Sequence, residues 1–191
     1  MIVLISGSPR RRELLSRITS KVIYDVSHVQ EPVGEKDPQK LVIKSARAKL
    51  KDRLHVHKKG ILLACDTIVY ADKVLGKPKN REEASQMLAF LSGRSHQVYT
   101  SLVLHDKNKG RLVEEVVCTK VYFSSLEEKE IQAYLDTGEY VDKAGGYGIQ
   151  GFGSLLVEKI EGDYFNVMGL PLNRLYLILK KEFSLDLLRD I

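Results

Sequence analysis

Short apolar runs and stretches with helical spacing follow one another along this chain, and the pattern predicts strands and helices in turn. The runs that predict strands lie at Leu4-Ile5, Val22–Val26, Ile61–Tyr70, His96–Leu104, Leu112–Phe123 and around Leu155–Val157. Capping residues or prolines predict helix starts at Ser8-Pro9, Asp37-Pro38, Asn80, Ser125 and Pro171.

The order of these elements predicts the fold class. Helices alternate with strands in the first part of the chain, and Lys107–Gly110 has the composition of a hairpin turn. A last strand and helix follow. This order favours an α/β or α+β fold with a mixed sheet, and the hairpin excludes a purely parallel one. A length of 191 residues suits a single domain.

The junction between the first strand and the first helix carries a cluster of cations. Ser8 suits the N-cap position and Pro9 the first helical position, which places Arg10–Arg12 in the first turn. A cation there loses roughly 0.3–1 kcal/mol against the helix macrodipole. With the close-approach glycine Gly7 and a serine hydroxyl, the junction predicts a phosphate site. The alternative is a solvated basic first turn.

Asp66 interrupts the nearly continuous apolar run Ile61–Tyr70. A carboxylate in such a strand is seldom buried without an ion pair, hydrogen bonds or a metal, so Asp66 is a candidate catalytic residue. A structural ion pair or cap is the alternative. Lys49 follows the apolar face of the second predicted helix, pointing inward unless it snorkels to solvent. Lys77 is presented from a turn, and Glu31 lies at a strand end or in a loop.

Several familiar motifs do not fit their required context. Residues 146–151 match G-x-G-x-x-G, but a predicted helix rather than a strand precedes them. The pair His55 and His57 has no third metal ligand nearby, and Ser8 has no His-Asp partner that spacing can assign. Two carboxylates, inward lysines, an anion-binding helix start and a glycine loop with Gln150 instead suit phosphoanhydride chemistry with a divalent cation.

Charge and cysteine content add modest constraints. The net charge of +5 suits a polyanionic ligand and falls short of the dense basic stripe of a nucleic-acid binder. Cys65 and Cys118 are far apart and predict two reduced core thiols in a reducing compartment. No run approaches the roughly 18 apolar residues of a membrane span. We therefore expect a cytoplasmic protein that has no membrane segment and does not bind nucleic acid.

The chain resembles the Maf family of nucleoside triphosphate pyrophosphatases. The resemblance is carried by Ser6–Arg11 with Glu13–Leu15, Asp66-Thr67, Leu75–Pro78, Glu83-Ala84 with Met87-Leu88, Leu91–Gly93, His96–Thr100, Asp142–Gly151 and Asn166–Pro171. It implies one domain over residues 1–191, with a long mixed sheet flanked by helices and two lobes around a cleft, as in inosine triphosphate pyrophosphatases. It also implies cleavage of a nucleoside triphosphate between the α and β phosphates with Mg²⁺ or Mn²⁺, and a homodimer.

The resemblance also implies roles for the charged residues. Asp66 matches the family's proton acceptor, and Glu31 matches its second acidic residue near metal and water, so that both would be metal ligands. Lys49 and Lys77 match charged partners of the triphosphate.

Other positions match the family's substrate contacts. Arg10, Thr67 and Gln150 match positions associated with base selection, and Ser8 and Arg11 match the phosphate end. The form of the glycine loop resembles the branch acting on dTTP and UTP. Since the family is also linked to septum formation, a nucleotide- or nucleic-acid-binding regulator of cell division is the competing hypothesis.

Overall fold

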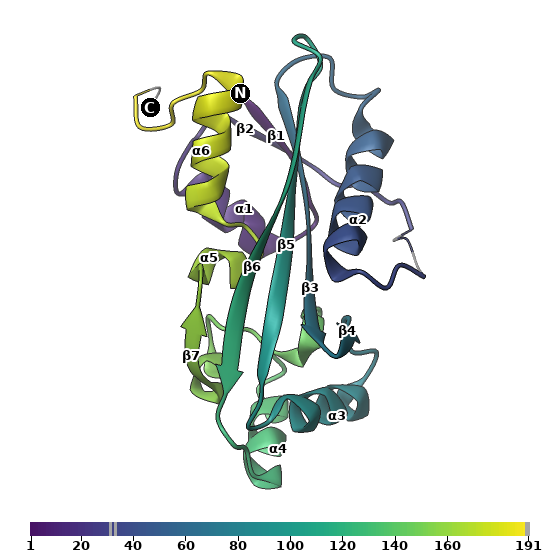
Figure 1. Cartoon of the computed structure of the whole chain (residues 1–191), viewed down its shortest axis with the longest axis vertical. Helices are drawn as coiled ribbons and strands as arrows, with labels where there is room; N and C mark the ends of the chain where they lie inside the picture. Colours follow the sequence, from purple (N-terminus) through teal and green to yellow (C-terminus); the bar gives the residue numbers. More distant parts are fainter. Residues whose placement is uncertain (31, 33, 190–191) are drawn as a thin grey trace. The chain divides into compact units, whose positions relative to one another are not determined.

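The computed structural model describes residues 1–30, 32 and 34–189, and its strands form one mixed sheet (Figure 1). Within the described part, the seven strands are β1 (Ile2–Ile5), β2 (Val22–Asp25), β3 (Ile61–Ala71), β4 (Lys73–Leu75), β5 (Ser95–Asp106), β6 (Arg111–Phe123) and β7 (Val157–Glu161). Their order is β2-β1-β3-β5-β6-β7, and β4 pairs with β3. The β1 strand is parallel to β2 and β3, whereas β3–β4 and β6–β7 are antiparallel. The predicted mixed α/β fold is therefore confirmed.

The chain divides into two compact units. The first comprises Met1–Asp66, Thr100–Val117 and Gly169–Ile191, and the second comprises Thr67–Tyr99 and Cys118–Met168. The strands β3, β5 and β6 contribute residues to both units. The single domain with two lobes around a cleft stays a prediction.

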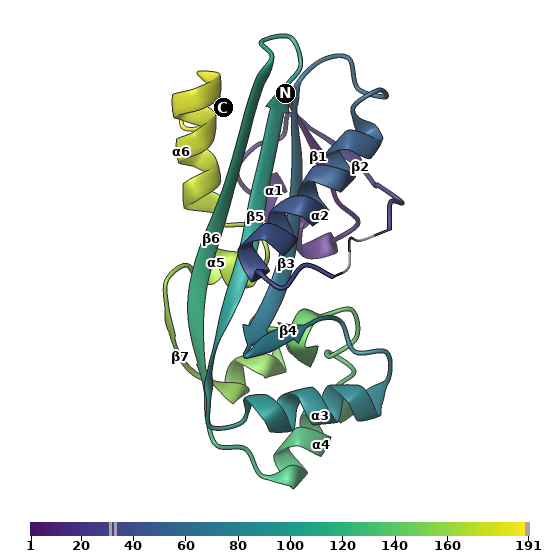
Figure 2. The same ribbon diagram turned by 45° about the vertical axis from the view of Figure 1, so that its right-hand side comes forward.

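In the first unit, helices α1 (Pro9–Ser16), α2 (Pro38–Arg53) and α6 (Leu172–Phe183) accompany β1, β2 and parts of β3, β5 and β6. The α2 helix lies in front of these strands in Figure 2. Its Ala46 and Leu50 pack against alternate residues of β1, β3 and β5, which form a core cluster of Val3, Ile5, Leu62, Ala64 and Val103. Because successive residues of a strand point to opposite faces, one face of β1 and β3 packs against α2.

The helix starts in this unit confirm the predicted caps. Ser8 has extended backbone angles, its Oγ accepts the Arg11 N–H, and Pro9 occupies the first turn of α1. Asp37 caps α2 by accepting the N–H groups of Gln39 and Lys40. Both caps satisfy amide groups that a helix start leaves without intrahelical partners.

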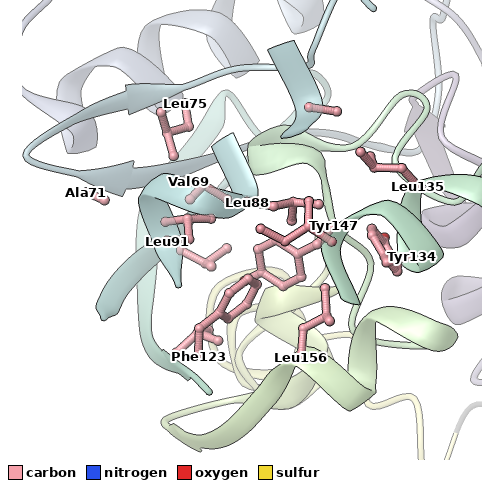
Figure 3. Packing of buried hydrophobic residues seen from close by; sticks show 14 residues of the cluster. Val69, Ala71, Leu75, Leu88, Leu91, Phe123, Tyr134, Leu135, Tyr147 and Leu156 are labelled. Atoms are coloured by element: carbon pink, nitrogen blue, oxygen red, sulfur yellow. The ribbon is translucent and has the colours of Figure 1, made fainter. Parts of the chain in front are cut away.

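The second unit contains α3 (Arg81–Leu91), α4 (Glu128–Asp136), α5 (Tyr164–Val167) and two 3₁₀ turns, η1 (Ala144–Gly146) and η2 (Phe152–Leu156). Its apolar core surrounds Tyr147, whose ring lies edge-on to that of Phe123 at 4.7 Å between centroids (Figure 3). Leu88, Leu91, Tyr134, Leu135 and Leu156 belong to the same cluster. The ring that fills this core is thus supplied by the predicted glycine loop.

Two predicted boundaries in the second unit are wrong. The helix expected to begin with a Ser125–Glu128 capping box is capped by Glu127, whose N–H donates to the Glu130 carboxylate. The chain before it is tied elsewhere, since the Leu126 N–H donates to Ser92 Oγ at 2.7 Å. This bond holds the residues before Glu127 outside the helix.

The strand expected around Leu155–Val157 begins at Val157. Leu155 and Leu156 lie in η2, because the Ser154 N–H and hydroxyl both donate to the Gly151 carbonyl and fold the chain into a turn. Cys118 is exposed rather than in the core, since the alternation along β6 places its buried neighbour Thr119 inside. Cys65 is buried as predicted, and burial raises its thiol pKa to about 11.

Within the described residues, every helix is too short or too polar to cross a lipid bilayer.

His96 is a titratable group in the core of the second unit. Its side chain is 2% exposed, its Nε2 lies 2.7 Å from the Tyr147 hydroxyl, and its ring lies edge-on to Phe123. Burial lowers the pKa of His96 from 6.5 to about 4. Because the unfolded chain binds a proton between these two values and the folded chain does not, His96 makes folding less favourable as the pH falls from 6.5 to 4.

We expect acidification to destabilise the wild-type chain more than the His96→Gln variant. The difference between their free energies of unfolding should shrink by about 3 kcal/mol as the pH is lowered through this window, because glutamine does not titrate. Urea unfolding at several pH values measures the difference. Parallel pH profiles for the two proteins would contradict the assignment.

Candidate active site

The junction between β1 and α1 holds its shape through hydrogen bonds to Ser6. The Ser6 side chain is buried, and its Oγ accepts the Ser8 N–H at 3.2 Å. The Arg12 guanidinium donates to the Ser6 carbonyl through Nε and Nη2, both at 3.3 Å, and lies over the Tyr24 ring. Arg10 is partly buried in the same first turn. The predicted cluster of cations at this helix start is therefore present.

Arg11 turns into the unit rather than toward solvent. Its side chain is 9% exposed, and its Nε donates to the Gly169 carbonyl at 2.7 Å. Its Nη1 donates to the Cys65 carbonyl at 3.1 Å and to Ser6 Oγ at 3.4 Å. Hydrogen bonds from a charged donor contribute about 1.5–3 kcal/mol each. The guanidinium thus ties the start of α1 to the peptide that directly precedes Asp66.

Asp66 is buried near the middle of β3 and is paired with a lysine of α2. Lys49 Nζ lies 2.5 Å from Asp66 Oδ1, and the two side chains are 18% and 11% exposed. The inward orientation predicted for Lys49 is therefore confirmed, and so is the partner predicted for the Asp66 carboxylate. Lys49 reaches this position because it continues the buried face of α2 that carries Val42, Ser45 and Ala46.

The backbone of Asp66 is also held. Its N–H donates to Ser101 Oγ at 3.3 Å, and the Ser101 hydroxyl donates to the Val42 carbonyl at 2.8 Å. Ser101 is fully buried on β5 and so links the strand of Asp66 to the helix of Lys49. Two separate connections, one through the carboxylate and one through the backbone, fix the orientation of this acid.

The Asp66 carboxylate is of the type that binds a divalent cation through oxygen, and Lys49 contacts its Oδ1 in this structure. Mg²⁺ usually takes one or two protein carboxylates, and water and substrate phosphates complete its coordination shell. Among the residues that the structure describes, no group of three His, Cys, Asp or Glu side chains is arranged to hold a metal. Glu31, the second predicted ligand, lies outside the described residues. His57 Nε2 lies 2.7 Å from Asp25 Oδ2, within hydrogen-bond distance of that carboxylate.

Three predicted site residues belong to the second unit. Thr67 is partly buried and directly follows Asp66 on β3. Lys77 does not point inward as predicted, because it is exposed in the turn after β4. In this turn the adjacent Gly76 carbonyl accepts the Gly145 N–H at 3.0 Å. Gln150 is exposed in the glycine loop between η1 and η2.

The sequence predicted that the glycine loop is not a dinucleotide-binding turn, and the structure agrees. The loop leads into the 3₁₀ turn η2 and the strand β7 rather than into a helix. Gly145 has φ +73°, and a Cβ there would lie 3.0 Å from Val69 Cγ2. The loop therefore needs glycine at this position both for its backbone angle and for close packing against β3.

Two features of the site, the inward direction of Arg11 and the role of Ser101, were not predicted from the sequence. Arg11 stands three and four residues before the buried Leu14 and Leu15, so helical periodicity places it on the inner face of α1. That signal was present in the sequence. For Ser101, nothing in the local pattern distinguishes it from other polar residues of an alternating strand.

Comparisons with known proteins identify the family of this chain. Residues 1–182 match the sequence model of a family described as Maf-like protein. A dTTP/UTP pyrophosphatase of Caldanaerobacter subterraneus is 48% identical over 96% of this chain and 89% of its own length. A dTTP/UTP pyrophosphatase of Pyrococcus furiosus is 46% identical over 90% of each chain. The Staphylococcus aureus Ham1 protein has a similar fold, with a TM-score of 0.53 and 13% identity over 95% of this chain and 98% of that one. The chain belongs to the Maf-like protein family.

Proposed function

We propose that this protein hydrolyses nucleoside triphosphates, with dTTP and UTP as its preferred substrates, to the nucleoside monophosphate and pyrophosphate. The observation that carries the proposal is the buried Asp66 carboxylate held by Lys49 beside a cationic helix start. Family membership and relatives named dTTP/UTP pyrophosphatase support the same reaction.

In the proposed reaction, Asp66 is the proton acceptor. The oxygen of a water molecule forms a bond to the α phosphorus while its proton passes to the carboxylate. The bond from the α phosphorus to the bridging oxygen breaks, and the electron pair leaves with pyrophosphate. Lys49 orients the acceptor through its 2.5 Å contact with Oδ1. Positioned general bases of this kind contribute about 10²–10⁴-fold to rates.

The first turn of α1 is the proposed phosphate site. Ser8 and Arg11 are its proposed residues, because amide groups and the macrodipole at a helix start favour an anion. The Arg11 guanidinium adds positive charge there while it donates to the Cys65 carbonyl. Lys77 of the second unit is the proposed further partner of the triphosphate, and Arg10, Thr67 and Gln150 are the proposed contacts of the base.

The proposed cofactor is Mg²⁺ or Mn²⁺, with Asp66 and Glu31 as its protein ligands. When bound, such an ion neutralises phosphate charge and lowers the pKa of a coordinated water. A cytoplasmic location and a homodimer also belong to the proposal; the free thiols of Cys65 and Cys118 are compatible with a reducing compartment.

Product identity is the direct test of the function. With Mg²⁺ present, dTTP and UTP should each yield one pyrophosphate per monophosphate, and CTP and methylated GTP should react more slowly. Ion chromatography separates pyrophosphate from orthophosphate. Orthophosphate as the sole product would contradict the proposed cleavage between the α and β phosphates. Steeply salt-dependent nucleic-acid binding without hydrolysis would instead favour the competing regulatory role.

Asp66→Asn should lower kcat/KM for dTTP by about 10²–10⁴-fold, because the amide cannot accept the proton. Asp72→Asn is the matched control, since Asp72 is an exposed aspartate paired with Arg94. Its activity should stay within about twofold of the wild type. Circular dichroism checks that both variants fold, and an Asp66→Asn variant with wild-type rates would show that another group accepts the proton.

Removal of divalent cations should abolish turnover. We expect dialysis against EDTA to stop pyrophosphate release, and Mg²⁺ or Mn²⁺ to restore it, because the ion offsets the negative charge that repels an attacking oxygen. Titration of the metal-free protein with Mn²⁺, followed by water-proton relaxation, measures binding independently of turnover. Full activity after complete chelation would remove the metal from the proposal.

A further inference from the structure

A single carboxylate organises the part of the glycine loop that follows Gln150. Glu139 lies after α4, and its Oε1 accepts the Phe152 N–H at 3.0 Å. Its Oε2 accepts the Gly153 N–H at 3.2 Å. Each oxygen therefore takes one amide at the start of η2, although the two segments lie 13 and 14 residues apart in the sequence.

Two glycines make room for this arrangement. A Cβ on Gly151 would lie 2.0 Å from Glu139 Oε1, and a Cβ on Gly153 would lie 2.3 Å from the Gly148 carbonyl oxygen. Neither residue has the positive φ that would itself require glycine. The glycines at 151 and 153 are thus explained by close packing around the carboxylate and within the loop rather than by backbone angle.

The other side of the loop is held by buried aromatic residues. The Tyr147 hydroxyl lies 2.7 Å from His96 Nε2, and the Gly148 N–H donates to the Tyr134 hydroxyl at 3.1 Å. The loop is consequently anchored at 147–148 and again at 152–153. Gln150 is exposed between these two anchors.

We propose that Glu139 is the positioning residue for Gln150, and through it for recognition of the nucleotide base. The proposal rests on the proposed function, in which Gln150 contacts the base. Glu139 does not touch substrate in this role. It restricts the loop to the conformation that presents Gln150, and apparent affinity falls in proportion when that conformation is less populated.

Glu139→Ala should raise KM for dTTP about tenfold, as expected if the competent loop is about a tenth populated, and should change kcat less than about threefold. Glu139→Gln keeps the shape and one acceptor oxygen, so its KM should lie between those of wild type and Glu139→Ala. Glu158→Gln is the matched control, an exposed glutamate of the same unit. It should leave both constants unchanged.

Two double variants separate positioning from a general structural role. In a Gln150→Ala background, Glu139→Ala should raise KM no further, because its effect passes through Gln150. Gly151→Ala alone should raise KM as Glu139→Ala does, because the added methyl group displaces the Glu139 carboxylate. When Glu139 is already alanine, Gly151→Ala should raise KM by a smaller factor. Additive effects in both cycles would overturn the proposal.

Amide hydrogen exchange measures how firmly the loop is held, independently of turnover. The amides of Phe152 and Gly153 should exchange faster in Glu139→Ala, while those of the α2 helix should not change. Faster exchange with an unchanged KM would show that the loop does not position the base contact. Slow exchange at these amides in Glu139→Ala would show that the carboxylate does not hold the loop. A wild-type protein that releases no pyrophosphate would instead refute the proposed function, and with it the role in base recognition.

Discussion

An ionised carboxylate inside a β-strand must have a partner, and the pairing of Asp66 with Lys49 meets that requirement. Desolvation of an unpaired charge at this depth would cost several kcal/mol. The pair therefore helps to fix how α2 lies on the sheet, because Lys49 of this helix reaches Asp66 of β3. Nearer the start of the same helix, the Val42 carbonyl accepts a hydrogen bond from the Ser101 hydroxyl of β5. Packing of Ala46 and Leu50 against β1 and β3 supports the same placement. The acid proposed for catalysis is thus also the group around which this helix and sheet are arranged.

The sequence predicted each member of this pair separately but did not predict that they pair. An aspartate within an apolar run must have a partner and a lysine on an apolar helix face points inward, yet only the structure shows that Lys49 is the partner of Asp66. The sequence predicts one anion site from the arginines of α1. Only the structure shows that Arg11 donates to the distant Gly169 and Cys65 carbonyls, whereas Arg12 donates to the nearby Ser6 carbonyl and lies over Tyr24. The partners of Arg11 are distant in the chain, so periodicity could place Arg11 inward but could not name what it would bind.

The glycine loop shows a second limit of sequence reasoning. Gly145 is explained by its positive φ and by its close packing against Val69. Gly151 and Gly153 have a different cause, which lies in Glu139 and in the Gly148 carbonyl. An acid in a polar stretch gives no local signal of this role, because its two hydrogen bonds form only when the chain folds back on itself. The misplaced cap at Ser125 has the same origin, since Ser92 binds the backbone just after it.

Different parts of the fold hold the proposed proton acceptor and the proposed base contact. Asp66 and Lys49 are fixed by α2, β3 and β5 within the first unit, whereas Gln150 is presented by a loop held through His96, Tyr134 and Glu139 of the second. A substitution that loosens the loop therefore leaves the orientation of the proposed proton acceptor intact. In the proposed hydrolysis, this separation lets base preference change while the support of the acid stays constant.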